Sequence, residues 1–402
     1  MSGKKVYLDN ACTSIVNQRV LEAADRYTDL YRSSEKSASD ITRECRTYLA
    51  EARSACAKLI NCKPNEIALV ESTSHAMGII GGMIPLKKGE NVLIADIEYQ
   101  ASVLCWEPRC HDIGFEMREV KTQNGQLHLK DFKRCFDENT RAIIVASVQE
   151  INGWRTDIRE IADFLEDKEC YLIVDGIQEV GAMQVDVKKM GADIYCAGGK
   201  KWLGNPFGKG FLYVGEELLP RFKPAFYSYF KVEMEGDFPD YITYLETPTR
   251  HPFDSYRLIE AASKFENGGY DNYLGALGLA EAVNLQIEIG SAEIERKIKE
   301  LNRYYQKGLE KLGIKSCSSM EDAHMSSIVS FNFGFKDGNI EKERRLIRFL
   351  QDRMVFVSLR STTGTGGIRA SMHYYNTQED IDALLEGIRC FLEQEERNSG
   401  SR

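Results

Sequence analysis

The sequence lacks the features that would place the protein in a membrane or on nucleic acid. No apolar run approaches the ~20 residues of a membrane-spanning helix, and the first residues do not resemble a signal peptide. The 52 basic residues are outnumbered by 61 acidic ones, and the net charge is −9. This balance argues against nucleic acid or an anionic membrane as a partner. We therefore expect a cytoplasmic protein that binds neither.

The sequence also lacks cysteine pairs. Its eleven cysteines are scattered, with no CxxC motif and no cluster rich in histidine. In a chain without a signal peptide, this pattern indicates reduced thiols rather than disulfides or zinc ligands. We expect no metal site.

A chain of 402 residues can bury a large core, and we predict two domains. Buried strands are predicted at 67–70, 92–96, 142–147, 171–175, 193–197 and 211–214, with a helix at 41–61. A strongly helical stretch at 271–313 contains the passage to a smaller lobe. That lobe has a segment at 327–333, a helix at 340–354, a strand at 355–358 and a final helix from residue 378.

The stretch from Tyr171 to Val214 organises the chain. An apolar strand ends in Asp175, and a second short strand is followed by Gly198-Gly199-Lys200-Lys201. Ligands of open parallel sheets lie beyond the carboxyl ends of the strands, where Asp175 and Lys201 both fall. A buried acid that faces a lysine there is what pyridoxal phosphate needs. The carboxylate keeps the pyridine nitrogen protonated, and the amine forms the Schiff base.

Blander interpretations compete with this one, because lysine pairs in loops are usually solvated and an Asp at a strand end is common. A nucleotide-binding loop is disfavoured, since Gly204 to Gly210 is one residue short of the Walker spacing. In addition, Gly210 stands where a Ser or Thr would bind magnesium.

Three motifs carry a resemblance to a known family. Asp175 and Gln178 match its Asp-x-x-Gln, 198–201 matches its Ser-Gly-His-Lys in part, and 205–210 is close to its Gly-Pro-x-Gly-x-Gly. On these motifs the chain resembles the class V aminotransferase and cysteine desulfurase family of fold type I pyridoxal-phosphate enzymes. The resemblance extends over nearly the whole chain.

The resemblance implies an α/β fold with a large domain built on a mostly parallel sheet and a smaller C-terminal α/β domain. It places an N-terminal segment that lines the site at 1–15, the cofactor domain at 16–260 and the smaller domain at 261–402. Tyr7-Leu8-Asp9-Asn10-Ala11 looks like the family's opening motif, which implies that Asn10 and Ala11 lie on the substrate side.

The strand at 67–70 runs into Glu71-Ser72-Thr73-Ser74-His75, where the free amides of a helix N-terminus would make an anion site. Ordinary capping by Ser or Thr is the alternative. The segment resembles the family's phosphate loop, which implies that Ser74 and His75 bind the cofactor. Lys200 replaces an imidazole of the family and supplies a point charge beside the phosphate.

Tyr99 stands where desulfurases have a histidine that stacks on the cofactor ring. A tyrosine can stack equally well, but it does not titrate near neutrality. The alternative is a partly exposed Tyr at a strand end. The loop after residue 147 resembles the family's loop beneath the cofactor, and Gln149 is our candidate for the ring oxygen or the substrate carboxylate; the role of Glu150 stays open.

Two further motifs concern the partner subunit and the substrate. Leu245 to Thr249 resembles a family loop whose threonine reaches the phosphate of the other subunit, which implies a homodimer with shared active sites. The segment from Gly367 to Thr377 resembles the family's Arg-x-Ser-x-x-x-Tyr-Asn-Thr. It implies that Arg369 grips the substrate α-carboxylate with its planar fork, although a lone strand Arg is usually a surface ion pair.

The chain departs from the desulfurases just before Arg369. Residues 361–367 contain no cysteine, and the nearest ones in sequence, Cys317 and Cys390, fall in other elements. Without a thiolate, persulfide chemistry lacks its nucleophile. A cysteine desulfurase is therefore disfavoured.

We expect an aminotransferase-like enzyme that acts on a small amino acid through an aldimine with Lys201. Transamination, epimerisation and β-elimination such as C–S cleavage all remain open, because side-chain contacts come from loops such as 225–234. A non-catalytic protein that keeps the fold is the remaining alternative. Asp175, Gln178, Lys201 and Arg369 count against it, since a scaffold need keep none of them.

Overall fold

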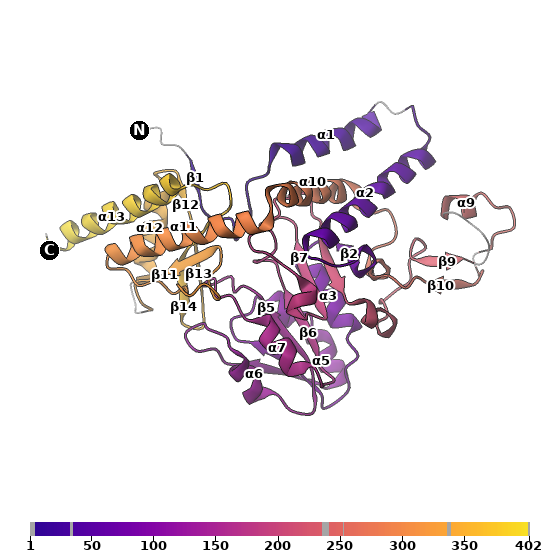
Figure 1. Ribbon diagram of the computed structural model, residues 1–402, viewed down its shortest axis with the longest axis horizontal. Coiled ribbons are helices and arrows are strands. Elements are labelled where there is room, and N and C mark those ends of the chain that lie inside the picture. The colour runs from indigo at the N-terminus through magenta and orange to yellow at the C-terminus, as the bar shows by residue number, and fades with distance from the viewer. Residues whose placement is uncertain (1–4, 33–34, 235–240, 252, 336–338, 401–402) are drawn as a thin grey trace.

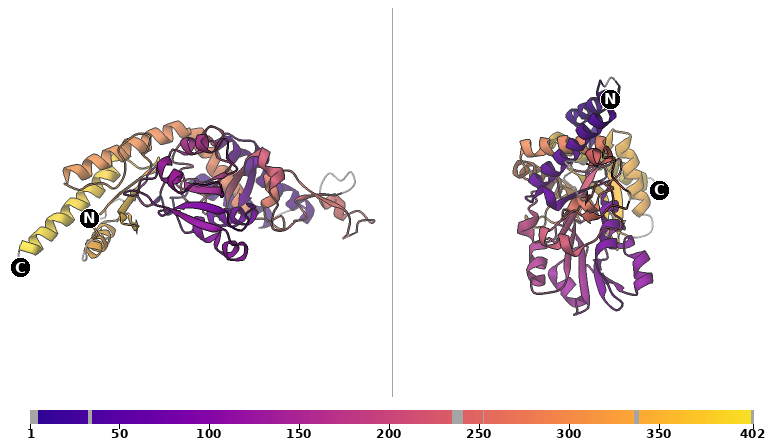
Figure 2. Two further views of the ribbon diagram at one scale, coloured as in Figure 1. Left: turned by 90° about the horizontal axis from the view of Figure 1, so that it is seen from below. Right: turned by 90° about the vertical axis from the view of Figure 1, so that its right-hand side faces the viewer.

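The computed structural model describes residues 5–32, 35–234, 241–251, 253–335 and 339–400. A large lobe forms the middle of the molecule, and a smaller lobe carries both ends of the chain (Figure 1). An arm projects on the side away from the smaller lobe (Figure 2). The arm consists of β9 (Val232–Met234), α9 (Tyr241–Leu245) and β10 (Tyr256–Leu258).

The large lobe is built on a seven-stranded sheet with the order β2-β8-β7-β6-β5-β3-β4. β8 is antiparallel to both of its neighbours, and the other pairs are parallel. The expected α/β fold with a mostly parallel central sheet is confirmed. The strands are β2 (Ile67–Val70), β3 (Asn91–Ala95), β4 (Glu116–Val120), β5 (Thr140–Ala146), β6 (Tyr171–Asp175), β7 (Ile194–Gly198) and β8 (Gly210–Val214).

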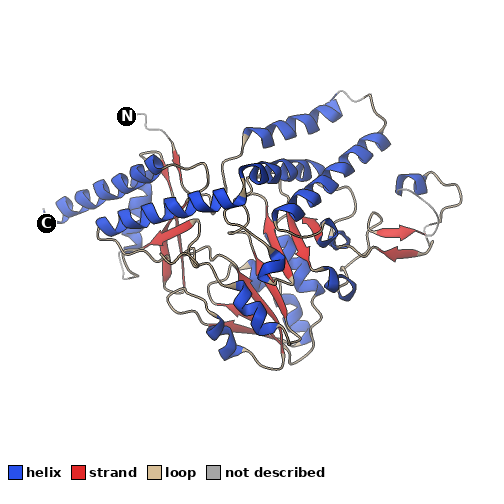
Figure 3. Ribbon diagram, in the orientation of Figure 1, coloured by secondary structure: helices blue, strands red, loops and turns tan. Residues whose placement is uncertain are grey.

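The central strands are apolar throughout because helices cover both faces of the sheet (Figure 3). Neighbouring residues of a strand point to opposite faces, so Leu172 and Val174 enter one core while Ile173 enters the other. The first core receives α2 (Ala38–Leu59) and α10 (Tyr273–Ile289), and the second receives α3 (Thr73–Met83). The remaining helices of this lobe are α1 (Gln18–Arg32), α4 (Ala101–Leu104), α5 (Glu107–Ile113), α6 (Leu129–Cys135), α7 (Ile158–Leu165), α8 (Val187–Met190) and the 3-10 turns η1 (Pro64–Glu66), η2 (Glu216–Arg221) and η3 (Ala262–Phe265).

The smaller lobe has a three-stranded antiparallel sheet in the order β11-β14-β13. A separate parallel pair joins β1 near the start of the chain to β12 near its end. Val6 and Leu8 are therefore buried in the core of this lobe. Its elements are β1 (Val6–Tyr7), α11 (Ser291–Lys311), β11 (Ile328–Phe331), α12 (Asn339–Gln351), β12 (Val355–Phe356), β13 (Ser358–Thr362), β14 (Thr365–Ser371) and α13 (Gln378–Gly400).

The helical stretch predicted at 271–313 is two helices rather than one. Gly290 separates α10 from α11 with a φ of +92°, a backbone conformation that favours glycine. α10 packs against α1 and α2 of the large lobe, whereas α11 packs mainly against α13. The predicted domain limits remain a prediction, and we propose that the smaller lobe begins near Gly290. None of the described helices is both long and apolar enough to cross a membrane.

Candidate active site

Two adjoining cavities lie beyond the carboxyl ends of β6 and β7. The inner cavity has a volume of about 190 Å³ and the outer cavity about 370 Å³. Tyr99, Lys200 and Lys201 line both of them. The two cavities therefore adjoin at these three residues.

Asp175 ends β6 and lines the inner cavity, where it is only 2% exposed. The amide of Ile177 donates to its carboxylate at 2.9 Å. Burial raises the pKa of Asp175 to about 6, and the Ile177 amide and the nearby Lys201 oppose this rise. The side chain is thus an anion above neutral pH, as a partner of a protonated pyridine nitrogen must be.

Lys201 follows β7 after two glycines that allow close approach of the backbone. A Cβ at Gly199 would lie 2.4 Å from the carbonyl oxygen of Lys209, so this position needs glycine. Burial lowers the pKa of Lys201 to about 8, and the charges of Glu150 and Asp175 oppose the decrease. An appreciable fraction of the amine is therefore neutral and nucleophilic near physiological pH.

The N-terminus of α3 faces the inner cavity through Ser72, Thr73 and Ser74. The Ser72 hydroxyl caps the helix by accepting the amide of His75 at 3.1 Å. Thr73 Oγ1 accepts the amide of Gly198 at 2.9 Å, which fastens the helix to β7. Within the described chain, the amides of Thr73 and Ser74 have no hydrogen-bond partner. They can receive an anion together with Lys200.

We call the anion site formed by Ser74, the amides of Thr73 and Ser74, and Lys200 the cradle. His75 is not part of it. Its Nδ1 accepts the amide of Glu71 at 3.3 Å, and its ring lines neither the inner nor the outer cavity. The predicted contact of His75 with the cofactor therefore remains a prediction without a side-chain position that supports it. The imidazole instead closes the turn that leads into α3.

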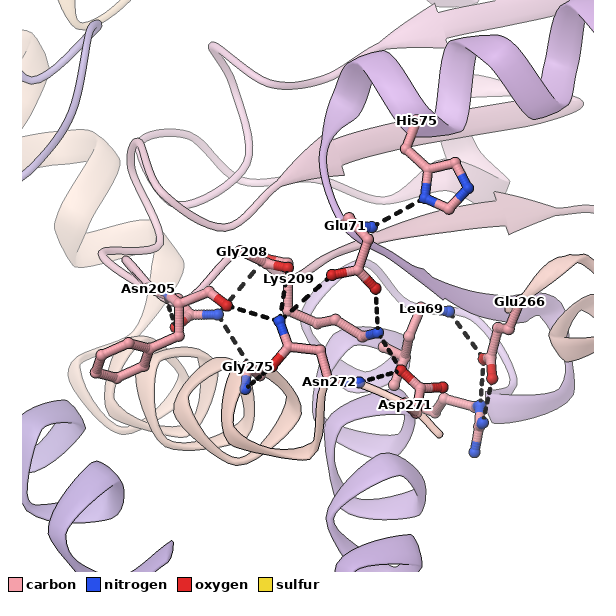
Figure 4. A network of polar contacts seen from close by, with 12 residues as sticks. Leu69, Glu71, His75, Asn205, Gly208, Lys209, Glu266, Asp271, Asn272 and Gly275 are labelled. Carbon is pink, nitrogen blue, oxygen red and sulfur yellow. Dashed lines mark hydrogen bonds and ion pairs between the residues drawn. The ribbon is translucent and has the colours of Figure 1, made fainter. Parts of the chain in front are cut away.

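An ion network centred on the buried Lys209 adjoins the cradle (Figure 4). Lys209, whose side chain is 1% exposed, donates to Glu71 at 2.8 Å and to Asp271 at 2.5 Å. Asn272 adds bonds to Glu71 at 3.3 Å and to the carbonyl of Gly208 at 3.1 Å. The two carboxylates raise the pKa of Lys209 despite its burial. The network joins the end of β2, the glycine-rich turn and the start of α10.

Tyr99 is 54% exposed, and its ring stands between the two cavities. Its neighbour Glu98 was not predicted as a site residue. Glu98 accepts the amide of Ala146 at 3.0 Å and Nε2 of Gln149 at 2.8 Å. Burial raises the pKa of Glu98 to about 7, and Asp175 adds to the rise. The Glu at this position was visible in the sequence, but its contact with the loop after β5 was not.

Gln149 is fully buried, and its Oε1 has no partner among the described residues. The assignment of oxygen and nitrogen in a side-chain amide follows from its hydrogen bonds. Gln149 lines neither of the two cavities, so its predicted contact with the cofactor ring remains a prediction.

The side-chain amide of Gln178 forms hydrogen bonds with other residues of the protein. Its Oε1 accepts Nε1 of Trp202 at 2.9 Å, and its Nε2 donates to the carbonyl of Ala11 at 3.2 Å. Gln178 lines neither of the two cavities. The structure thus gives it a role in holding the N-terminal segment, and its contact with the cofactor remains a prediction.

The N-terminal segment crosses from the smaller lobe to the site. Asn10 is buried and donates to the carbonyl of Ser371 at 2.6 Å, while Tyr375 donates to its side-chain oxygen. Asn10 therefore lines no cavity, whereas Ala11 and Cys12 line the outer one. Cys12 was missed by the sequence interpretation, which looked for a thiol only near Arg369.

Arg369 lines the outer cavity from β14, and it is 1% exposed. Its Nε donates to Ser358 Oγ at 3.2 Å, and its Nη1 donates to the carbonyl and to a carboxylate oxygen of Glu150 at 3.0 and 3.2 Å. Its Nη2 donates to Asp9 at 3.4 Å. Arg360 also lines this cavity. The arginine predicted to grip a substrate carboxylate is thus paired with two carboxylates of its own chain.

The segment without cysteine forms a tight hairpin between β13 and β14. Thr362 pairs with Thr365, and Thr363 and Gly364 make the turn with φ angles of +44° and +75°. Cys317 lies nearby, donates to the carbonyl of Gly366 at 3.5 Å and has a pKa raised by burial. It lines neither of the two cavities, so it brings no thiolate to Lys201.

Thr249 is exposed and lies in the arm between α9 and β10, where it lines neither cavity of its own chain. The arm projects away from the body of the molecule (Figure 2). The prediction that Thr249 reaches the site of another subunit stays a prediction.

The residues fit pyridoxal phosphate. An acid for the ring nitrogen, an amine and an anion cradle line the inner cavity from elements far apart in the sequence. Asp175, Lys201, Ser74, Lys200 and Tyr99 are brought together at the inner cavity.

The comparisons with known proteins agree with this geometry. Residues 6–384 match the family model for aminotransferase class V. The chain is 28% identical over 395 residues to a probable cysteine desulfurase of Methanothermobacter thermautotrophicus, and the match covers 95% of this chain and 94% of that protein.

Two solved structures share the fold. The apo structure of a cysteine desulfurase from Thermococcus onnurineus NA1 matches with a TM-score of 0.83 at 24% identity, covering 97% of this chain and 95% of that one. A complex between a cystine C–S lyase and its reaction product cysteine persulfide matches with a TM-score of 0.83 at 20% identity, covering 95% and 97%.

Proposed function

We propose that this chain, which belongs to the aminotransferase class V family, is a C–S lyase that acts on a small sulfur-containing amino acid. The protein is an enzyme, and its cofactor is pyridoxal 5′-phosphate. The observation that carries the proposal is the position of Lys201. Lys201 lines both cavities, the inner one together with Asp175 and the outer one together with Arg369.

Elimination is favoured over the other reactions by two considerations. The relatives named above act on sulfur amino acids by their names, which supports a sulfur-containing substrate. The hairpin of β13 and β14 offers no cysteine to take the sulfur, so the sulfur leaves the substrate without passing to a thiolate there. Transamination and epimerisation remain alternatives at the same site.

The chain's residues divide the work. Bound pyridoxal phosphate supplies an electron sink for the α-carbon of the substrate. Asp175 would stabilise positive charge on the ring nitrogen, and the amides of α3 with Ser74 and Lys200 would hold the phosphate. Arg369 orients the substrate carboxylate.

Lys201 moves the proton. Its lowered pKa leaves neutral amine near pH 8, and this amine takes the proton from the α-carbon at Nζ. The bond between the β-carbon and sulfur then breaks, and the sulfur leaves with the electron pair. Tyr99 lines both cavities, where its ring would stack on the cofactor.

The test is a product assay with purified holoenzyme. Cysteine and cystine are offered first, and pyruvate, ammonia and sulfide or persulfide are measured; alanine with a keto acid is the control for transamination. Pyruvate and released sulfur in step support the proposal, and Lys201→Ala should lose nearly all turnover. Exchange of alanine for a keto acid without release of sulfur contradicts it.

Borohydride reduction of the holoenzyme tests the lysine itself. The reduced adduct should be found by mass spectrometry on Lys201. An adduct on Lys200 would show that the motif has been aligned one residue away from its true position.

A cysteine desulfurase is the second candidate, and one observation favours it. Cys12 lines the outer cavity together with Lys201 and Arg369. In that reaction the thiolate attacks the substrate sulfur, the C–S bond breaks, and alanine is formed instead of pyruvate. A persulfide trapped on Cys12, and lost in Cys12→Ser, would identify this reaction.

We also propose a homodimer with shared active sites. The exposed Thr249 lies on the arm, which also exposes large hydrophobic side chains such as Phe253, which is 90% exposed, and Tyr256, which is 41% exposed. Such surfaces mark contacts with another chain. A monomer that is fully active at working concentrations would contradict the proposal.

A further inference from the structure

Almost all hydrogen-bond donors of the Arg369 guanidinium have acceptors within the protein itself. The guanidinium has five N–H donors. Ser358 takes the donor on Nε, the carbonyl and carboxylate of Glu150 take the two on Nη1, and Asp9 takes one of the two on Nη2. A two-pronged grip on a substrate carboxylate therefore needs a donor that one of these carboxylates now holds.

Glu150 is the carboxylate that can leave. Glu150 lines the outer cavity, where a ligand can meet its carboxylate, whereas Asp9 lines neither cavity, although the two side chains are similarly exposed, at 18% and 22%. The carboxylate of Glu150 lies 3.2 Å from Nη1, which is longer than the ~2.7–2.9 Å of a strong charge-assisted bond. The main-chain carbonyl of Glu150 also holds Nη1 at 3.0 Å. Arg369 thus stays in place when the Glu150 side chain moves away.

The displaced carboxylate has other cations within the same cavity. Glu150 and Lys201 both line this cavity, and the charge of Glu150 opposes the decrease in the pKa of Lys201. Lys200 and Arg360 line the cavity as well. A Glu150 side chain that leaves Arg369 therefore remains among positive charges and does not become an isolated buried anion.

We propose that Glu150 is a specificity-determining residue that occupies the position of the substrate carboxylate on Arg369 and is displaced when substrate binds. The proposal rests on the role proposed for Arg369 in binding that carboxylate. Its consequence is that the affinity for any small carboxylate is lowered by internal competition. A ligand gains only the difference between its own contacts with Arg369 and those of Glu150.

The probe that tests this is propionate, which has a carboxylate but no amine to react. Its dissociation constant for the holoenzyme is measured by titration calorimetry at pH 8. Glu150→Gln keeps the shape of the side chain and removes the charge, and it should bind propionate about tenfold more tightly or better. Glu150→Ala should shift the affinity in the same direction, and neutral propionamide should bind all variants alike.

Two controls separate competition at Arg369 from a general change in charge. In an Arg369→Gln background, adding Glu150→Gln should change the propionate affinity less than about twofold, because the shared partner is gone. Glu98→Gln removes another carboxylate from the outer cavity, one that has no bond to Arg369. It should likewise change the affinity less than about twofold.

An unchanged or weaker affinity in Glu150→Gln overturns the inference, because Glu150 would then hold Arg369 for the ligand instead of competing with it. A gain of equal size in Glu98→Gln also overturns it. Propionate binding is measured without turnover. Failure of the C–S cleavage assay therefore leaves this test intact, and failure of this test leaves the proposed reaction standing.

Discussion

Lys209 and Arg369 are two buried cations in similar surroundings, but we assign a structural role to Lys209 and a ligand-binding role to Arg369. Each is 1% exposed, and each lies between two carboxylates. Lys209 approaches Glu71 and Asp271 at 2.8 and 2.5 Å, whereas Arg369 approaches Glu150 and Asp9 at 3.2 and 3.4 Å.

The difference lies in what else the carboxylates contact. The shorter of the two Lys209 pairs is made with Asp271, which is 4% exposed and lines neither cavity, so this pair is enclosed, whereas Lys209 itself and the 46% exposed Glu71 line the inner cavity. Glu150 faces the outer cavity, where a substrate can replace it. A short, enclosed ion pair holds elements together, and a longer pair at a cavity wall can be exchanged for a ligand. Composition alone does not distinguish the two.

Removing Lys209 should have the largest effect on stability. Lys209→Met leaves Asp271 buried without its cation, and loss of one partner of a buried pair costs about 3–5 kcal/mol. The free energy of unfolding is measured by denaturant titration. Lys209→Arg, which keeps the charge, should lose much less. A loss below about 1 kcal/mol for Lys209→Met would remove the distinction between the two cations.

Removing Arg369 should affect recognition more than stability. Arg369→Gln should lower kcat/KM for carboxylated substrates by a factor of about 30–1,000, which corresponds to about 2–4 kcal/mol. Amines without a carboxylate should be affected far less. Equal losses on both kinds of substrate would mean that this arginine is structural, like Lys209.

The two lysines should also differ in reactivity. In protein freed of cofactor, acylation of Lys201 should rise with pH through a midpoint near 8, because its amine is protonated below that value and neutral above it. Glu150→Gln should move the midpoint lower, since the negative charge of Glu150 raises the pKa. Lys209, whose pKa is raised, should stay unmodified. Mass spectrometry of the labelled peptides measures all three.

The smallest effect is expected for a substitution at Thr249. It tests whether the phosphate cradle of one subunit needs a residue from the arm of another subunit. Thr249→Ala should weaken retention of the cofactor by about fivefold, as expected for loss of one hydrogen bond worth ~1 kcal/mol. Equilibrium dialysis against cofactor-free buffer measures it. Unchanged retention in a confirmed dimer would show that the phosphate cradle needs no residue from the arm.

The sequence was sufficient for the parts of the site that depend on one strand end. Asp175 and Lys201 follow apolar strands, and the carboxyl ends of neighbouring parallel strands must lie together. The hydroxyl-rich turn into α3 could be identified for the same reason. Such predictions need only local patterns and the sheet topology.

The sequence was insufficient where a side chain chooses among distant partners. Glu150 lies 219 residues from Arg369, and nothing local indicates that they pair. Gln178 matches a family motif, yet Trp202 and Ala11 take its amide. These contacts follow from packing between lobes, which periodicity and motif spacing do not encode.

The pairing of β1 with β12 has a consequence for how the protein is made. Val6 pairs with Val355, so the first strand has no partner until about 350 residues have been synthesised. At about 5–20 residues per second, that interval is roughly 20–70 s. The large lobe can collapse during this time, while Val6 and Leu8 remain exposed. The smaller lobe therefore completes its fold last, after its final strands have been synthesised. Arg369, which lies on β14 of this lobe, takes its place in the site at the same time.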